Sequence, residues 1–221
     1  MTIRGQEFFL LPEKALWWRD GKALLLSDLH LGKSRHFRKK GIPVPSGDTE
    51  ETLGQLQRAI QKTGVERVFL LGDLFHSSWN SDWNFMSRMN ENYSDLEFVL
   101  IVGNHDILPT ELYAKTGIKT ALQWELSSEI LLTHEPGAGT GDPHYRISGH
   151  LHPGITIRGK GRQFLRVPCY WFAENQAVLP AFGSFTGLQT IRPGSSDKVY
   201  AIFEGGVYPV NSKDKTQGAF D

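Results

Sequence analysis

The chain has 221 residues with 39% hydrophobic and 22% charged content, which is ordinary for a globular protein and long enough to bury a good core as one domain. Its 24 basic and 24 acidic residues give a formal net charge of zero, so any attraction to nucleic acid or anionic membrane must come from a local patch. The single cysteine excludes an internal disulfide, and the apolar runs are far shorter than the ~20 residues of a membrane helix, so we expect no membrane contact.

The first half of the chain alternates predicted strands with predicted helices. Its start, "MTIRGQEFFLLPEK", lacks the long apolar core of a secretory signal, so we expect a cytoplasmic protein. Asp20 and Gly21 lie between two apolar runs and supply the positive-φ residues of a tight hairpin turn, which predicts a strand over 23–27. A helix is expected over 46–62, where Asp48 and Glu51 have capping-box spacing and Gly64 ends the pattern.

Further along, a strand is expected over 65–71, a helix over 81–92, a strand over 96–102 and a short helix entered through Pro109. This alternation predicts a largely parallel sheet. After about Lys119 the pattern changes to short β-rich segments, which predict a second sheet. We expect one domain over 1–210 and a polar tail over 211–221 that is poorly ordered.

Side chains of the kind that bind metals follow each predicted buried strand. They are Asp28 and His30, then Asp73, then Asn104, His105 and Asp106 in the first half, with His134, His150 and His152 in the β-rich half. Because ligands bind beyond the carboxyl ends of the strands in open α/β sheets, we expect these side chains to meet. Alternate residues of an extended segment share a face, so the pairs 28/30 and 150/152 can each point into one site. Glycines 72, 103 and 149 beside them permit sharp turns.

The number of these side chains decides between a structural and a functional interpretation. A lone aspartate or histidine at a strand end is usually a cap or a satisfied surface group. Burying the whole set at one sheet edge would be costly unless cations or hydrogen bonds compensate. A mixed nitrogen and oxygen set of this size suits two divalent ions ~3.5–4 Å apart, with Asp73 as the candidate bridge. Imidazole favours zinc or iron and carboxylate favours manganese, so the donors alone admit all three.

Five motifs in order, "DLH", "GDLFH", "GNHD", the histidine of "LLTHE" and "GHLH", resemble the calcineurin-like metallophosphoesterases. The resemblance implies an α/β fold, a four-layer α/β/β/α sandwich with two mixed sheets packed face to face and flanking helices, around a dinuclear site. It implies one ion held by Asp28, His30, Asp73 and His152, and a second held by Asp73, Asn104, His134 and His150. His105 would be the unligated catalytic acid, and Asp106 would hold its ring.

The segments "SDLHLGKSRHFRKKGIPVP", "RVPCYWF" and "LPAFGSFTG" narrow the resemblance to the ligase-associated DNA damage response endonucleases of bacteria, the PdeM family. Members are described as manganese-dependent phosphodiesterases, which implies two Mn²⁺ ions here, with iron or zinc as alternatives. It also implies a DNA or RNA phosphodiester substrate and a role in DNA repair. A DNA ligase or helicase of the same repair system is then a candidate partner; the oligomeric state stays open.

Three residues are candidates for contact with substrate. Lys33 and Arg35 begin a basic run over 33–40, which is either a solvated charged face or a grip on phosphates whose strength falls steeply with salt. His76 stands where many relatives carry arginine, and it is either a substrate contact or a surface loop residue.

The favoured function is a dinuclear-metal phosphodiesterase that uses metal-activated water, acting as a nuclease in DNA repair. One alternative keeps this chemistry and changes the substrate to cyclic nucleotides or other small phosphate esters. The other is a non-catalytic scaffold of the metallophosphoesterase type, against which the complete ligand set and His105 both argue.

Overall fold

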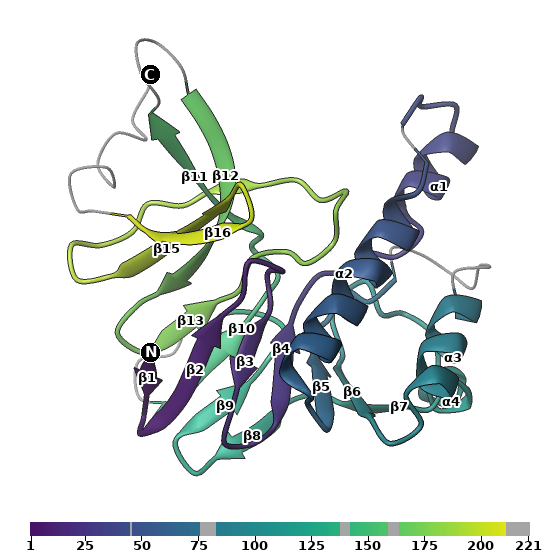
Figure 1. Ribbon diagram of the computed structural model, residues 1–221, viewed down its shortest axis with the longest axis horizontal. Coiled ribbons are helices and arrows are strands. Elements are labelled where there is room, and N and C mark those ends of the chain that lie inside the picture. The colour runs from purple at the N-terminus through teal and green to yellow at the C-terminus, as the bar shows by residue number, and fades with distance from the viewer. Residues whose placement is uncertain (45, 76–82, 138–141, 159–163, 211–221) are drawn as a thin grey trace.

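The computed structural model describes residues 1–44, 46–75, 83–137, 142–158 and 164–210. Two β-sheets pack face to face, and the helices lie on the outer side of the first sheet (Figure 1). The first sheet and its helices comprise β1 (Thr2–Ile3), β2 (Gln6–Leu10), β3 (Leu16–Trp18), β4 (Ala23–Leu26), α1 (Lys33–Lys39), α2 (Asp48–Thr63), β5 (Arg67–Leu70), α3 (Trp83–Asn92), β6 (Glu97–Ile101), α4 (Thr110–Lys115) and β7 (Ile118–Ala121). The second sheet comprises β8 (Trp124–Ser127), β9 (Ile130–Leu132), β10 (Tyr145–Ser148), β11 (Pro153–Arg158), β12 (Phe164–Phe172), β13 (Gln176–Val178), β14 (Gln189–Thr190), β15 (Lys198–Phe203) and β16 (Gly206–Pro209).

The first sheet has the order β1-β2-β3-β4-β5-β6-β7, and its last four strands are parallel neighbours. The predicted alternation of strands and helices is therefore confirmed. The expected boundary at Lys119 was wrong by one strand, because β7 pairs in parallel with β6 and completes the first sheet. Of the helices described, none combines the length and apolar content needed to span a bilayer.

The hairpin between β3 and β4 is confirmed, but its turn differs from the prediction. Lys22 has the positive φ, 46°, whereas Asp20 and Gly21 do not. Gly21 is needed for space, since a Cβ there would lie 2.1 Å from the indole of Trp18. The dipeptide therefore marked the turn correctly for a different physical reason.

Helix α2 runs from Asp48 to Thr63, and its C-cap Gly64, with a left-handed φ of 60°, confirms the predicted stop. The capping box is wrong, because Gly47 is the N-cap and no side chain caps the helix. The carboxylate of Asp48 instead accepts hydrogen bonds from the backbone N–H and the hydroxyl of Ser34. Asp48 therefore joins α2 to α1.

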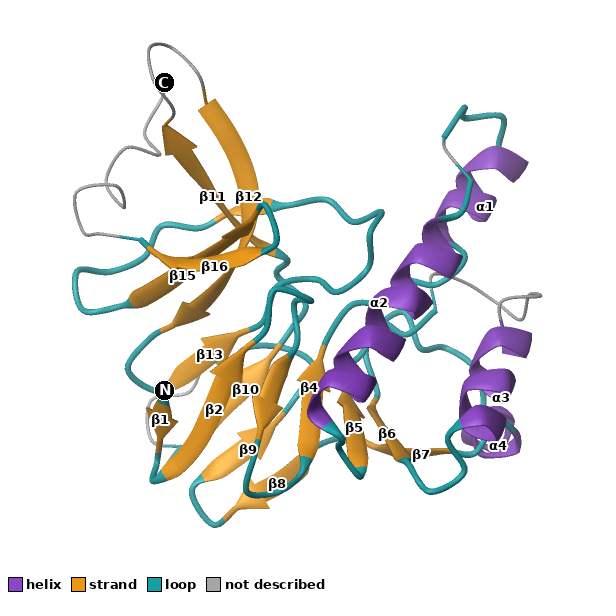
Figure 2. Cartoon of the chain, in the orientation of Figure 1, coloured by secondary structure: helices purple, strands orange, loops and turns teal. Residues whose placement is uncertain are grey.

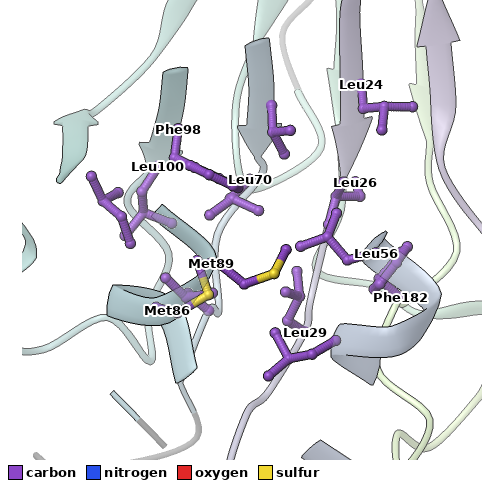
Figure 3. Close-up of a cluster of buried hydrophobic side chains, with 14 of the residues drawn as sticks. Leu24, Leu26, Leu29, Leu56, Leu70, Met86, Met89, Phe98, Leu100 and Phe182 are labelled. Atoms are coloured by element: carbon purple, nitrogen blue, oxygen red, sulfur yellow. The ribbon is translucent and has the colours of Figure 1, made fainter. Parts of the chain in front are cut away.

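Two apolar cores lie on the two faces of the first sheet. Helices α2 and α3 cover one face with Leu56, Met86 and Met89, which pack with Phe98 and Leu100 from the sheet (Figure 3). The opposite face packs on the second sheet. The buried residues of this second core are Ile3, Phe8, Leu16, Ala23, Leu25, Phe69, Leu71, Val99, Ile101, Ile130, Leu132, Tyr145, Ile147, Tyr170, Phe172, Ala177, Leu179 and Ile202. Side chains of successive strand residues alternate between these cores, as the pleat requires.

The α/β class with two mixed sheets packed face to face is confirmed. All helices of the described chain precede residue 116, and those that contribute to a core pack on the first sheet (Figure 2). Part of the outer face of the second sheet is covered by Ile191, from the segment after β14, which packs with Val167, Cys169 and Val199. The predicted tail over 211–221 lies outside the described residues.

We predict that Phe98→Ala lowers the free energy of unfolding by about 3–5 kcal/mol, because the ring is fully buried and its removal leaves a cavity. Chemical denaturation measures this change in the free energy of unfolding, and the m-value should stay the same. The matched variant Phe164→Ala should lose no more than about 1 kcal/mol, since that side chain is 54% exposed. Equal losses from both variants would contradict the assignment of the core.

Candidate metal centre

Six of the predicted ligands form two compact groups. The first is Asp28, His30 and His152, the second is Asp73, His134 and His150, and within each group the donor atoms all lie within 4.8 Å of one another. The amide oxygen of Asn104 lies 2.9 Å from Nε2 of His134, which adds the seventh predicted ligand to the second group. The structure therefore brings together all seven side chains, which come from loops at the ends of both sheets.

Asp73 lies between the two groups. Its Oδ2 is 3.8 Å from Nε2 of His30, and its Oδ1 is 3.5 Å from Nε2 of His134. One carboxylate oxygen therefore faces each group, which is the arrangement of a bridging carboxylate.

The second group concentrates hydrogen-bond acceptors at one point. Nδ1 of His134 lies 2.9 Å from the carbonyl oxygen of Leu71, so this nitrogen carries the proton and Nε2 presents a lone pair. That Nε2 is 2.9 Å from Oδ1 of Asn104 and 3.1 Å from Nδ1 of His150. A cation would neutralise acceptors packed this closely, so the donor set fits a divalent metal.

The first group has the same character. Nε2 of His30 and Nε2 of His152 are 3.2 Å apart. Oδ1 of Asp28 lies buried 3.4 Å from Nε2 of His152 and has no hydrogen-bond partner among the described residues. Burial lowers the pKa of His30 to about 3, against the opposing charge of Asp28, so the imidazole is neutral near neutral pH. Burial acts to raise the pKa of Asp28, but His152 and two further imidazoles outweigh it and lower the pKa. A neutral imidazole and an ionised carboxylate are the forms that bind metals.

Five of the seven predicted ligands adopt a left-handed backbone conformation. Their φ angles are 54° at Asp28, 47° at His30, 53° at Asp73, 68° at His150 and 48° at His152. This corrects the extended geometry expected for the two alternating pairs, which lie in loops beyond β4 and β10. Such residues store strain of about 1–3 kcal/mol each, and they persist where the surroundings hold them for function.

The glycines predicted beside the ligands, at positions 72, 103 and 149, approach ligand side chains closely. A Cβ at Gly72 would lie 2.0 Å from Nδ1 of His134, and one at Gly103 would lie 2.5 Å from Oδ1 of Asp73. The room that these glycines leave is therefore occupied by the ligands themselves.

We predict that Gly72→Ala lowers metal affinity by at least about tenfold, because the new methyl group displaces the imidazole of His134. Isothermal titration calorimetry with the metal measures this affinity. The control is Gly64→Ala, which has the same left-handed strain, with φ 60° against 81°, but meets no atom within 4 Å. An equal loss of affinity in both variants would assign the effect to backbone strain alone.

Asp106 holds the backbone around the centre. Its carboxylate accepts hydrogen bonds from the N–H groups of Asp73 at 2.8 Å, Leu74 at 3.0 Å and Gly103 at 2.9 Å. The predicted contact of Asp106 with the ring of His105 stays a prediction. Burial raises the pKa of Asp106 to about 6, although the three N–H donors oppose this shift.

His105 lies at the edge of the first group. Its backbone N–H donates to Oδ1 of Asp73 at 3.0 Å, and its ring meets that of His30 edge to face with centroids 5.4 Å apart. It is half-buried and belongs to neither ligand group.

The three candidate substrate residues have different positions. Half-buried Lys33 opens α1; burial lowers the pKa of its ammonium, against the nearby charges of Asp28 and Asp73. Arg35 follows two residues later, roughly 200° further round the helix, so the two side chains leave different faces. His76 lies outside the described residues.

Some supporting groups had no recognisable signal in the sequence. The backbone N–H of Gly183 donates to the carbonyl of Asp28 at 3.2 Å, and Nζ of Lys14 donates to the carbonyls of Phe182 and Gly183. These contacts join three distant segments through backbone atoms, which every residue carries. Only the segment "LPAFGSFTG", which contributed to the family resemblance, pointed to this region.

Comparisons with known proteins identify the family to which the chain belongs. Residues 21–163 match the sequence model of the calcineurin-like phosphoesterases. A search of curated proteins finds no match. The crystal structure of Pseudomonas putida nuclease MPE is similar with a TM-score of 0.80 and 32% identity, covering 95% of this chain and 98% of that one. The Escherichia coli phosphoesterase Yfce has a TM-score of 0.44 and 16% identity, covering 85% of this chain and 97% of its own.

Proposed function

This chain belongs to the calcineurin-like phosphoesterase family, and from that premise we propose that it is a dinuclear-metal phosphodiesterase that cleaves nucleic acid. The metal-dependent phosphoesterase class follows from the family and from the two ligand groups. The position of Asp73, with one oxygen towards each group, is the observation that supports a pair of ions. The similarity to a nuclease over 95% of the chain supports a polynucleotide substrate.

We assign two roles to the residues of the site, which are to hold the metal ions and to donate a proton. When bound, two divalent cations polarise the phosphoryl group and lower the pKa of the attacking water. Asp28, His30 and His152 hold one position, His134, His150 and Asn104 hold the other, and Asp73 serves both. The mixed donors accept manganese, which we propose as the ion in the cell, with iron or zinc as alternatives.

His105 is the proposed general acid. Its ring lies against His30 at the edge of the first group and outside both ligand sets, so it can face a departing oxygen. Proton transfer of this kind contributes typically ~10²–10⁴-fold to a rate. Asp106 supports it indirectly, by fixing the backbone on both sides of the centre.

Basic side chains of α1 are proposed to bind the substrate backbone. Lys33 lies close enough to Asp28 and Asp73 for their charges to act on it, and Arg35 and Arg38 follow on the same helix. Phosphate contacts of this kind make affinity fall with salt. A role in DNA repair rests on the family resemblance. The ligase or helicase partner and the cytoplasmic location stay predictions.

Reconstitution of the metal-free protein tests this function. Turnover should disappear with a chelator and return with Mn²⁺ at two ions per chain. Single-stranded DNA, bis-p-nitrophenyl phosphate and 2′,3′-cyclic nucleotides serve as parallel substrates, and cleavage of DNA is the expected result. Turnover of cyclic nucleotides alone would favour the small-ester alternative, and no metal-dependent turnover would favour the scaffold.

A further inference from the structure

A cavity of about 380 Å³ opens beside the second ligand group and has no part in the chemistry described so far. Two candidate ligands, Asn104 and His134, form part of its wall, and Arg146 of β10 also lines it. The remaining wall consists of Val102, Leu122, Thr133, Glu135, Pro136 and Gly137. Its volume lies within the ~300–1,000 Å³ typical of small-molecule sites, and its lining is both apolar and polar.

Arg146 is held in a fixed orientation at this cavity. Its Nε donates to Oδ2 of Asp142 at 2.7 Å, and one Nη donates to the same oxygen. Oδ1 of Asp142 accepts in turn from the backbone N–H of His144 at 2.9 Å. A Cβ at Gly137 would lie 2.3 Å from Cδ of Arg146, so the glycine leaves room for the arginine. Within the described chain, the side-chain bonds of Arg146 go to Asp142 alone, which leaves the donors of the second Nη for a ligand.

The position of the cavity indicates which substituent of a phosphodiester it could bind. A phosphodiester carries two substituents on its phosphorus, one of which departs. The ring of His105 lies against that of His30 in the first group. With His105 as the proposed general acid, the departing oxygen would lie on that side. This leaves the side of Asn104 and His134, where the cavity opens, for the substituent that stays on the phosphorus.

The chemistry of the lining favours a nucleobase over a second phosphate. Asp142 balances the charge of Arg146, and Glu135 is exposed at the same wall, so the cavity has no excess of positive charge. The apolar side chains of Val102, Leu122 and Pro136 suit the faces of a base. The remaining Nη donors of Arg146 suit an acceptor on the edge of a base, such as O6 or N7 of guanine.

We propose that this cavity binds the nucleoside retained on the scissile phosphate, with Arg146 donating to acceptor atoms on the edge of its base. The inference rests on the proposed phosphodiesterase function and adds a determinant of substrate specificity to it. Arg146 is a binding residue here and takes no part in the chemical step.

Two p-nitrophenyl esters with the same leaving group test the proposal in the Mn²⁺-loaded protein. One carries guanosine 5′-phosphate and the other carries methyl phosphate, so they differ only in the retained substituent. We expect kcat/KM to be at least about tenfold higher for the guanosine ester, through a lower KM. Arg146→Met should remove most of this ratio, because the base loses its donors.

Two further variants show whether an effect of Arg146→Met comes from the cavity or from misfolding. Leu122→Glu changes a side chain that is 84% exposed, so the fold tolerates it, and its charge at the cavity should also lower the ratio. The control Arg67→Met removes another strand arginine that is paired with a carboxylate, Glu97, and its ratio should stay as in the wild type.

The outcomes separate this inference from the function on which it rests. Equal efficiency with both esters in the wild type would overturn the nucleoside site and leave the phosphodiesterase intact. An unchanged ratio in both Arg146→Met and Leu122→Glu would do the same. Failure to hydrolyse either ester with Mn²⁺ bound would overturn the proposed function itself.

Discussion

Replacing Asp73 with alanine should release both cations and abolish phosphodiester hydrolysis. The carboxylate has one oxygen 3.8 Å from Nε2 of His30 and the other 3.5 Å from Nε2 of His134, so its loss weakens both positions at once. The decrease in kcat/KM should exceed the ~10²–10⁴-fold that removal of a general acid gives. Metal analysis of the purified variant by mass spectrometry gives the bound stoichiometry.

Asp20→Ala is the control for this substitution, because it removes an exposed carboxylate from the turn between β3 and β4. It should retain two ions and full turnover. Asp73 also accepts the backbone N–H of His105, so circular dichroism must show that the variant is folded. A folded Asp73→Ala protein that still holds two ions would exclude the bridging role.

The second large effect is expected from His105→Ala, which should keep both ions and lose ~10²–10⁴-fold in the rate of DNA cleavage. The ring belongs to neither ligand group, so metal content should not change. Because the variant removes a proton donor, its effect should depend on how strongly the leaving group needs protonation.

Comparison of two substrates isolates this role. A deoxyribose alkoxide leaves poorly without a proton, whereas p-nitrophenolate leaves readily as the anion. The loss in His105→Ala should therefore be much smaller with bis-p-nitrophenyl phosphate than with DNA. An equal loss with both substrates would show that the imidazole positions the phosphate instead of protonating the leaving oxygen.

The clustering of the candidate ligands could be predicted from sequence, because the ends of buried strands are recognisable there. Apolar runs that stop abruptly at Asp28, Asp73 and Asn104 mark the carboxyl edge of a parallel sheet, where ligands gather. The conformation of these residues could not be predicted. The left-handed φ angles of Asp28 and Asp73 depend on hydrogen bonds from distant segments, such as Gly183 N–H to Asp28 and Asp73 N–H to Asp106.

The role of Asp106 shows a second limit of sequence. Its position next to His105 predicted a contact with that ring, which stays a prediction, whereas no pattern in the sequence indicated that its carboxylate accepts hydrogen bonds from the backbone of residues 73, 74 and 103. Adjacent residues in a loop point in directions that the loop geometry sets. The assignment of β7 failed for a related reason, because the sheet that a short β-rich segment joins is decided by its neighbour in space.

The composition of the ligand groups has a consequence for the integrity of the molecule. Each group combines side chains from loops of the first sheet with side chains from loops of the second: Asp28 and His30 with His152, and Asp73 with His134 and His150. Bound ions therefore cross-link the two halves of the sandwich at one edge. By mass action, the midpoint of thermal unfolding should rise with the concentration of free metal. Chelation would then loosen the contact between the sheets as well as stop the reaction.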